Sequence, residues 1–297
     1  MAKLYGALGL LSLIWGMSFY FIKMLLEDLG PFAIVFGRCF FGAVTLALIA
    51  FASRKNVLKG LPWTKLLLVG ILNNALPWLF ISASETKITS SLASIVNATT
   101  PLWTLIIGFL FFSSSLRKNQ WVGIIIGFVG IFILSDISSS HVFAGDTVGV
   151  LYMIGAAACY GIGTQLSRKY FADLTVLQIS LTTLSFASIV SFVLLMLKSP
   201  HTVLDIFQLD TLLLFIGLGS FGSGVAYLLF YYLVQKGSAE FASLVTYLVP
   251  VTAILWGAIL LNEQVKMSMI LGLMIIFSGV YISSLKLKKK EKNKQAA

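Results

Sequence analysis

The side chains best suited to chemistry are few in this sequence and lie far apart. Its cysteines, Cys39 and Cys159, and its histidines, His141 and His201, form no cluster with the spacing of a metal site. Both cysteines fall within apolar stretches, so we expect neither a disulfide framework nor a thiolate metal site. No set of acid, base, nucleophile and metal can be assembled. We therefore predict no enzyme activity, no metal and no cofactor.

One glycine-rich stretch has the spelling of a dinucleotide-binding loop. GLGSFG at 217–222 matches the pattern G-x-G-x-x-G. That motif binds a pyrophosphate only where a strand precedes it and a helix follows it, whereas this stretch lies inside an apolar run. We interpret it as a chance match.

Arg38 is the ionisable residue placed most clearly inside an apolar stretch. A central arginine costs roughly 2.5 to 3.5 kcal/mol on membrane-insertion scales, so Arg38 should face protein or water. It is a candidate for substrate attraction or gating; the alternative is a structural arginine bonded to carbonyls of neighbouring helices. No Asp or Glu is predicted deep within a span, and eight of the eleven, Glu85 and Glu263 among them, are predicted at outer ends or in outer loops. The expected lack of a buried carboxylate favours facilitated movement over proton coupling.

The elements that position these residues are predicted to be membrane-spanning helices. The chain has 297 residues, of which 58% are hydrophobic and 11% are charged, and its apolar runs are separated by short polar gaps. A helix needs about 20 apolar residues to cross the hydrocarbon core. We predict an all-α membrane protein with ten spans, approximately at 4–26, 31–52, 64–84, 88–112, 119–135, 147–166, 175–197, 210–233, 240–261 and 266–285.

The net charge of +10 is distributed unevenly between the gaps. With a cytoplasmic N-terminus, most lysines and arginines fall on the cytoplasmic side, including those of the tail KLKKKEKNK. The opposite gaps hold only Lys23, Lys87, Lys198 and Lys266. This bias predicts that both termini are cytoplasmic. We expect the tail to contact membrane lipids and expect no nucleic-acid partner.

The two halves of the chain resemble each other at a fixed offset. A shift of 149 residues places LASIVNATTPLWTLIIGFLFF over FASLVTYLVPVTAILWGAILL without a gap. Pro101 then meets Pro250, and Gly108 meets Gly257. Shared prolines and glycines at one offset are harder to obtain by chance than shared leucines.

The start of each half aligns less strongly, at a slightly different offset, with Gly16 over Gly161. We predict a first five-helix repeat at 1–137, a second at 147–285 and a basic cytoplasmic tail at 286–297. Because five is odd, the second repeat must enter the membrane from the opposite side. Inverted repeats are typical of secondary transporters, whose substrate site lies at the midplane between the halves.

Polar residues beside the aligned prolines predict where that site lies. A proline frees the carbonyl four residues before it, here those of Asn97 and Thr246. Small and polar residues continue along the same helical faces, which should therefore turn away from lipid. The predicted cavity lining is Asn73, Trp78, Asn97, Thr100, Tyr227, Ser243 and Thr246, with Pro77, Pro101 and Pro250 as bending points.

Two alternatives bear on these faces. One alternative is that the small residues only let helices pack closely, as we expect for GIIIG at 123–127. Other aromatic residues with polar atoms at the same depth are interpreted as packing or interfacial side chains: Trp15, Trp103, Tyr160 and Tyr247.

Four segments carry a resemblance to a known family: LIWGMSFYFIK, PFAIVFGRCFFGAVTLAL, SLASIVNATTPLWTLIIGFLFF and FASLVTYLVPVTAILWGAILLNEQ. Together they resemble the EamA family of the drug/metabolite transporter superfamily. The resemblance implies ten helices in two inverted repeats, residence in the bacterial inner membrane, and export of amino acids, other metabolites or toxic compounds. Arg38 matches an arginine common in the second span. Glu263 matches a glutamate that follows the ninth span, whereas Ser114 replaces its counterpart after the fourth.

We therefore predict a transporter, an exporter of small metabolites such as amino acids or drug-like compounds, that works by alternating access. Its partners would be a small-molecule substrate and membrane lipids. Arg38 and Glu263 are assigned to gating or to structure. The alternative is a lipid-handling or structural membrane protein in which the polar faces are dry packing seams and no solute crosses.

Overall fold

The computed structural model describes residues 2–54, 57–113, 116–134, 145–236 and 245–284, and the regular elements within these ranges are all helices. In chain order the first half contains α1 (Ala2–Asp28), α2 (Pro31–Ala52), α3 (Trp63–Gly70), the π-helix η1 (Ile71–Ala75), α4 (Leu76–Glu85), α5 (Ser90–Asn97), α6 (Thr100–Phe111) and α7 (Lys118–Leu134). The second half contains α8 (Gly145–Tyr170), α9 (Val176–Lys198), the short 3₁₀ turns η2 (Pro200–Val203) and η3 (Asp205–Phe207), α10 (Leu209–Phe215), the π-helix η4 (Ile216–Val225), α11 (Ala226–Lys236), α13 (Val245–Leu260) and α14 (Met267–Ser284).

The helices have the length and composition expected of membrane spans. In the described part of the chain, seven are long and apolar enough to cross a bilayer, and Leu248–Leu260 and Met267–Ser283 are shorter apolar helices. A helix satisfies its own backbone polar groups, which is why it suits an apolar solvent. Large apolar side chains also face outward; Phe51 is 85% exposed. The prediction of an all-helical membrane fold is confirmed at this level.

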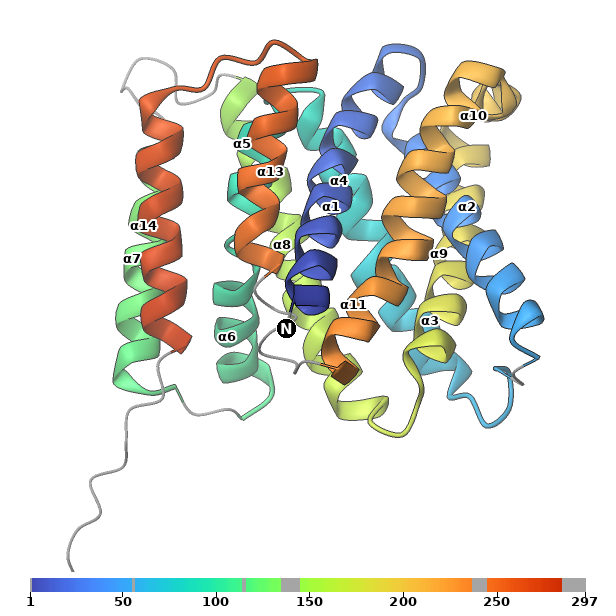
Figure 1. Cartoon of the computed structure of the whole chain (residues 1–297), viewed down its shortest axis with the longest axis horizontal. Coiled ribbons are helices and arrows are strands. Elements are labelled where there is room, and N and C mark those ends of the chain that lie inside the picture. Colours follow the sequence, from blue (N-terminus) through green and yellow to red (C-terminus); the bar gives the residue numbers. More distant parts are fainter. Residues whose placement is uncertain (1, 55–56, 114–115, 135–144, 237–244, 285–297) are drawn as a thin grey trace, which may run out of the picture.

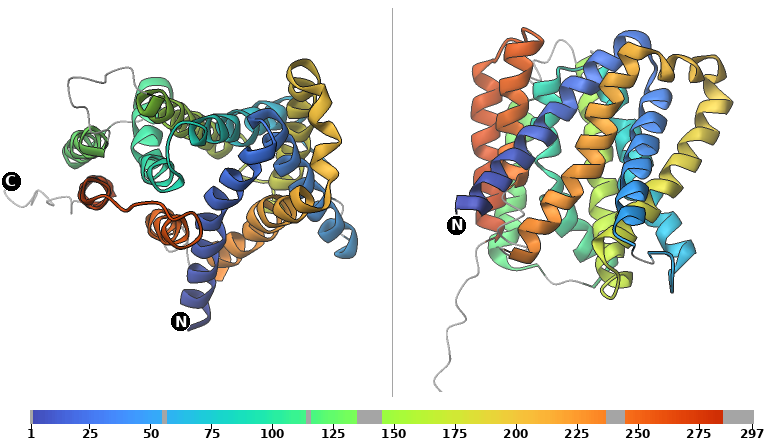
Figure 2. Two further views of the ribbon diagram at one scale, coloured as in Figure 1. Left: turned by 90° about the horizontal axis from the view of Figure 1, so that it is seen from above. Right: turned by 45° about the vertical axis from the view of Figure 1, so that its right-hand side comes forward.

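The helices stand side by side, with α7 and α14 paired at one edge of the molecule and α2 and α9 paired at the other (Figures 1 and 2). Between these pairs, α1 packs on α13 and α8 packs on α6. Likewise α11 packs on α1 and α4 packs on α8. The middle of the molecule therefore contains helices from both halves.

Glycines permit the closest of these contacts. A Cβ at Gly123 would lie 2.8 Å from the backbone nitrogen of Ser283 and would overlap the carbonyl of Gly279. A Cβ at Gly279 would lie 2.7 Å from the nitrogen of Gly127. The prediction that GIIIG at 123–127 is a close-packing motif is confirmed, because backbones this close leave no room for side chains.

Close contacts recur at matching positions in the two halves. A Cβ at Gly70 would lie 2.7 Å from the carbonyl of Thr183, and one at Gly219 would lie 3.1 Å from the carbonyl of Arg38. The two glycines are 149 residues apart, and η1 and η4 overlap at the same shift. Short π-helical segments of this kind often occur at functional sites.

The helix predicted over 88–112 is broken in the structure. α5 ends at Asn97 and α6 begins at Thr100, with Pro101 in its first turn. In the second half Pro250 lies inside the continuous helix α13. The two aligned prolines therefore have different helical settings, one at a helix start and the other within a helix.

Candidate functional site

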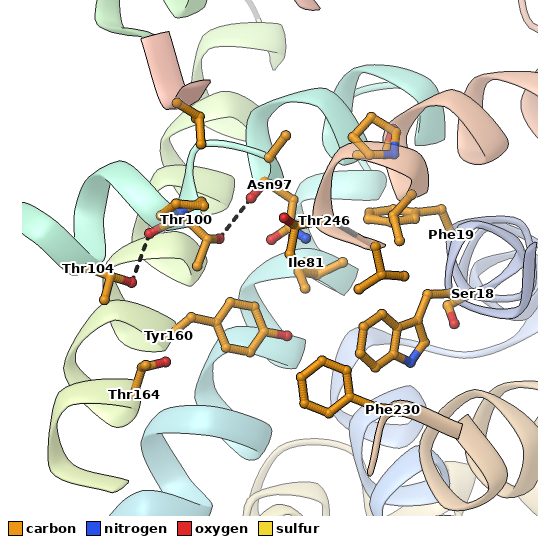
Figure 3. A pocket seen from close by; sticks show the side chains of 18 of the residues that line it. Ser18, Phe19, Ile81, Asn97, Thr100, Thr104, Tyr160, Thr164, Phe230 and Thr246 are labelled. Atoms are coloured by element: carbon orange, nitrogen blue, oxygen red, sulfur yellow. Dashed lines mark hydrogen bonds between the residues drawn. The ribbon is translucent and has the colours of Figure 1, made fainter. Parts of the chain in front are cut away.

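A cavity of about 720 Å³ lies among helices of both halves (Figure 3). Its volume falls within the range of about 300 to 1,000 Å³ that small-molecule sites occupy. The structure places most of the predicted residues on its wall: Trp78, Asn97, Thr100, Tyr227 and Thr246, together with Arg38, Pro101 and Pro250. Their functions remain predictions; their convergence on one cavity is observed.

Of the predicted site residues that the structure describes, three are not part of this lining: Asn73, Pro77 and Glu263. Asn73 lies in η1 and packs against α8, where a Cβ at Gly163 would overlap its side chain. The prediction that Asn73 lines the cavity is wrong, because its side chain packs against α8 at Gly163 instead. On a regular α-helix Asn73 lies about 140° away from Trp78, so the spacing did not place both on one face. Pro77 lies buried at the start of α4, directly after that turn. Ser243 falls outside the described residues.

Other lining residues were not selected from the sequence. Ser18, Phe19, Thr164 and Phe230 all reach the wall (Figure 3). Trp15 and Tyr160, which we had interpreted as packing or interfacial residues, also lie there. The alignment of Gly16 with Gly161 pairs Trp15 with Tyr160 and Phe19 with Thr164. The weaker alignment of the two halves could therefore have identified these four residues as members of the cavity lining.

Arg38 is held in a fixed position on the wall. Its Nε donates to Ser223 Oγ at 3.2 Å, and its guanidinium carbon lies 4.0 Å from the centre of the Trp78 ring. Only 8% of its surface is exposed. The cation–π contact and the hydrogen bond fix the guanidinium plane while leaving its terminal nitrogens without a partner among the described residues.

The break between α5 and α6 supplies polar groups to the cavity. Pro101 cannot donate to the carbonyl of Asn97, and Thr100 Oγ1 donates to it instead at 2.7 Å (Figure 3). Thr104 Oγ1 in turn donates to the carbonyl of Thr100 at 3.0 Å. The Oδ1 atom of Asn97 accepts no hydrogen bond within the described structure. A buried amide oxygen of this kind needs water or a ligand.

We expect Thr100→Val to lower the free energy of unfolding by about 1 to 3 kcal/mol, because the Asn97 carbonyl would lose its partner within the membrane. Thr100→Ser keeps the hydroxyl and should stay close to the parent. Equilibrium unfolding in mixed micelles measures both. The matched control is Thr86→Val, since Thr86 makes a similar bond in an exposed position. An equal effect of the changes at 100 and 86 would contradict this role.

A polar network closes the end of the molecule at which α5 begins, which we call the far end. The carboxylate of Glu263 accepts from the backbone nitrogens of Ser90 and Ser91 at 2.8 and 3.0 Å, and from Ser91 Oγ at 2.5 Å. It therefore caps the N-terminus of α5, where the helix dipole favours negative charge. Asn262 has a φ of 52°, which turns the chain back after α13. Gly257 leaves room for the carboxylate, because a Cβ there would lie 2.6 Å from Glu263 Oε2.

Glu85 belongs to the same network and corrects our expectation that no carboxylate is buried. It ends α4 as predicted, yet it is 0% exposed. Its Oε2 accepts from Ser90 Oγ at 2.6 Å, and its Oε1 has no hydrogen-bond partner among the described residues. Lys23 Nζ donates to the carbonyl of Glu85 at 2.7 Å. Helix ends can be buried by neighbouring helices, which a single sequence does not reveal.

The cavity extends toward the opposite end, where α7 begins and α14 ends (Figure 1). Arg117, Gln120 and Ser283, which lie at those helix ends, are part of its lining. The network around Glu263 and Ser90 lies at the far end. The described lining thus reaches one end of the molecule, and the Glu263 network lies at the other.

Comparison with known proteins identifies the family of the chain. The model of the EamA-like transporter family matches residues 4–136 and again residues 147–285. The chain belongs to the EamA-like transporter family. It is thus a multi-pass membrane protein of a transporter family, as the sequence motifs predicted.

Relatives match along nearly the whole chain. An "Uncharacterized transporter" of Archaeoglobus fulgidus is 27% identical, with 94% of this chain and 98% of that protein covered. The "Uncharacterized inner membrane transporter YedA" of Escherichia coli strain K12 is 29% identical, with 95% and 90% covered. The "Uncharacterized transporter YoaV" of Bacillus subtilis is 25% identical, with 93% and 96% covered.

A solved crystal structure shares the fold of this EamA-like protein. It superposes with a TM-score of 0.66 at 18% sequence identity and covers 93% of this chain and 95% of the other. At this identity the likeness concerns the fold alone.

Proposed function

We propose that this EamA-like protein moves small metabolites, such as amino acids or drug-like compounds, across the bacterial inner membrane by alternating access, in the direction of export. The observation that carries the proposal is the position of the cavity. It lies between the two halves, is reached from one end and is covered at the far end by the Glu263 network. A transporter that exposes its site to each side in turn requires one closed end at a time.

The proposal includes ten helices in two inverted repeats, at 1–137 and 147–285. The recurring contacts support this division. A Cβ at Gly16 would lie 2.9 Å from the nitrogen of Ala253, and one at Gly161 would lie 3.2 Å from the nitrogen of Thr104. Shifting Thr104 by 149 residues gives Ala253. The family model matches each half separately, which also supports two repeats.

We further propose that both termini are cytoplasmic. Lys118 begins α7, and Arg168 and Lys169 lie in the last turn of α8, at the end of the molecule toward which the cavity extends (Figure 1). Basic residues collect on the cytoplasmic side of membrane proteins. The structure would then represent a state open to the cytoplasm, ready to load a solute for export. The basic tail, 286–297, lies outside the described residues; we propose that it contacts acidic lipids, and we propose no nucleic-acid partner.

Flux through the purified protein tests the function. Liposomes that contain it should take up and release members of a labelled pool of amino acids, nucleosides and aromatic carboxylates faster than protein-free liposomes, with or without a proton gradient. Stimulation of flux by the proton gradient would indicate proton coupling, and the buried carboxylate of Glu85 would then be the first candidate for the proton carrier. An absence of flux for the entire pool would contradict the proposal and favour the lipid-handling alternative.

The cavity residues provide a second test, once a solute is known. We expect Asn97→Ala and Thr246→Ala each to raise the KM for transport by about tenfold, because each removes polar atoms from the cavity wall. Thr86→Ala is the matched control, since Thr86 is exposed and away from the cavity. If both cavity variants kept the parent kinetics, the site assignment would be wrong.

A further inference from the structure

We propose that the solute of this cavity is an organic anion whose carboxylate binds Arg38 and whose body is apolar or aromatic. This inference rests on the proposed transport function and names its substrate class. It follows from the charges on the wall, the free positions on the guanidinium and the side chains around it.

The charged groups of the wall have one sign. Arg38 and Arg117 line the cavity, and its described lining contains no Asp or Glu. Arg38 makes no ion pair with any described residue. Glu85 is the closest candidate for a counter-ion, but it lies outside the lining and directs its carboxylate to Ser90. A positively charged cavity with low-dielectric walls concentrates anions and repels cations.

The guanidinium is oriented to receive a carboxylate. Ser223 occupies its Nε and Trp78 covers one face, so the terminal nitrogens remain for a ligand. Those nitrogens present parallel N–H groups that match the oxygens of a carboxylate. Because the surrounding contacts already fix the side chain, little conformational entropy is lost when the ligand binds.

The remaining wall suits an apolar body with few polar groups. The aromatic residues Trp15, Phe19, Tyr160, Tyr227 and Phe230 share the cavity with Arg38. Aromatic faces pack favourably against flat or apolar ligands. The Oδ1 atom of Asn97, which has no partner among the described residues, can accept a hydrogen bond from the solute. It would therefore select for a solute that also carries a hydrogen-bond donor.

Matched acids and amides test the proposal directly. Binding of phenylacetate and indole-3-acetate to the purified protein is compared by calorimetry with binding of phenylacetamide and indole-3-acetamide, which keep the shape and lose the charge. We expect each acid to bind about tenfold more tightly than its amide, because a hydrogen bond to a charged group is roughly twice as strong as a neutral one. Amides that bind as tightly as the acids would overturn the inference, and so would an absence of binding by all four compounds.

Variants locate the effect at Arg38. Arg38→Gln should remove the preference for the acids and Arg38→Lys should keep part of it, while Arg117→Gln tests whether charge at the cavity entrance suffices. An undiminished preference in Arg38→Gln would overturn the assignment. If Arg38→Gln does not fold, Ser223→Ala serves instead, because it removes the hydrogen bond that orients the guanidinium. We expect it to reduce the preference for acids over amides severalfold. An unchanged preference would count against the site.

Failure of the inference and failure of the function give different results. Flux of only neutral or cationic solutes would leave transport standing and refute the anion site. Binding of the acids without any flux of them would uphold the anion site and contradict transport.

Discussion

Gly123→Leu is expected to lower the free energy of unfolding by about 3 kcal/mol and to reduce the amount of monodisperse protein after solubilisation. The new side chain would enter the contact between α7 and α14, where even a Cβ would meet the carbonyl of Gly279 and the nitrogen of Ser283. Backbone atoms cannot rotate aside as a flexible side chain can, so the two helices must separate.

The control for this change is Gly9→Leu. Gly9 lies within α1, and a Cβ there would meet nothing within 4 Å. Both changes add the same side chain to a helix, so the difference between their unfolding curves in mixed micelles isolates the packing contact. Equal stabilities of the two variants would contradict the close approach of α7 and α14.

Glu263→Ala is the second change with a large expected effect, here on conformation. The parent carboxylate accepts three hydrogen bonds from Ser90 and Ser91, and these hold the connection between α13 and α14 against α5. Hydrogen bonds to a charged group contribute about 1.5 to 3 kcal/mol each, although they are not additive. A loss of about 2 kcal/mol would shift the closed-to-open equilibrium of the far end roughly thirtyfold toward open.

Double electron–electron resonance between spin labels on the α13–α14 connection and on α5 would measure this shift as a longer distance distribution. Glu263→Gln keeps one acceptor oxygen and should give an intermediate population. Glu27→Ala is the matched control, because Glu27 is an exposed acid at the same end and makes none of the hydrogen bonds of the network described here. Unchanged distances in Glu263→Ala would show that these bonds do not hold the far end closed.

The fold was predictable to the extent that apolar run length determines it. α2, for example, begins and ends where the run 31–52 does. The break between α5 and α6 was less predictable, because a proline can either kink a helix or interrupt it; Pro250 and Pro101 illustrate the two outcomes. Which outcome occurs depends on whether another group, such as Thr100 Oγ1, satisfies the freed carbonyl.

The cavity was predictable where helical periodicity stays regular. Asn97 and Thr246 line the cavity, as their positions on faces of small and polar residues predicted. Thr100 lines it too, although the helix is interrupted between Asn97 and Thr100. The prediction for Asn73 failed because it placed Asn73 and Trp78 on one wall, although they lie about 140° apart on a regular α-helix. The burial of Glu85 also depends on tertiary contacts, since helices from distant parts of the chain cover it. In contrast, Trp15 and Tyr160 could have been found from the weaker alignment of the two halves.

The central claim is that a cavity at Asn97 opens to each side of the membrane in turn. The most direct test measures how fast a membrane-impermeant maleimide labels Asn97→Cys in vesicles of each orientation. The parent protein is the control for background labelling, since its Cys39 and Cys159 are buried. We predict reaction from either side, with the outer rate raised and the cytoplasmic rate lowered when Glu263→Ala is added. Reaction from neither side would mean a dry packing seam, and reaction from one side under all conditions would contradict alternating access.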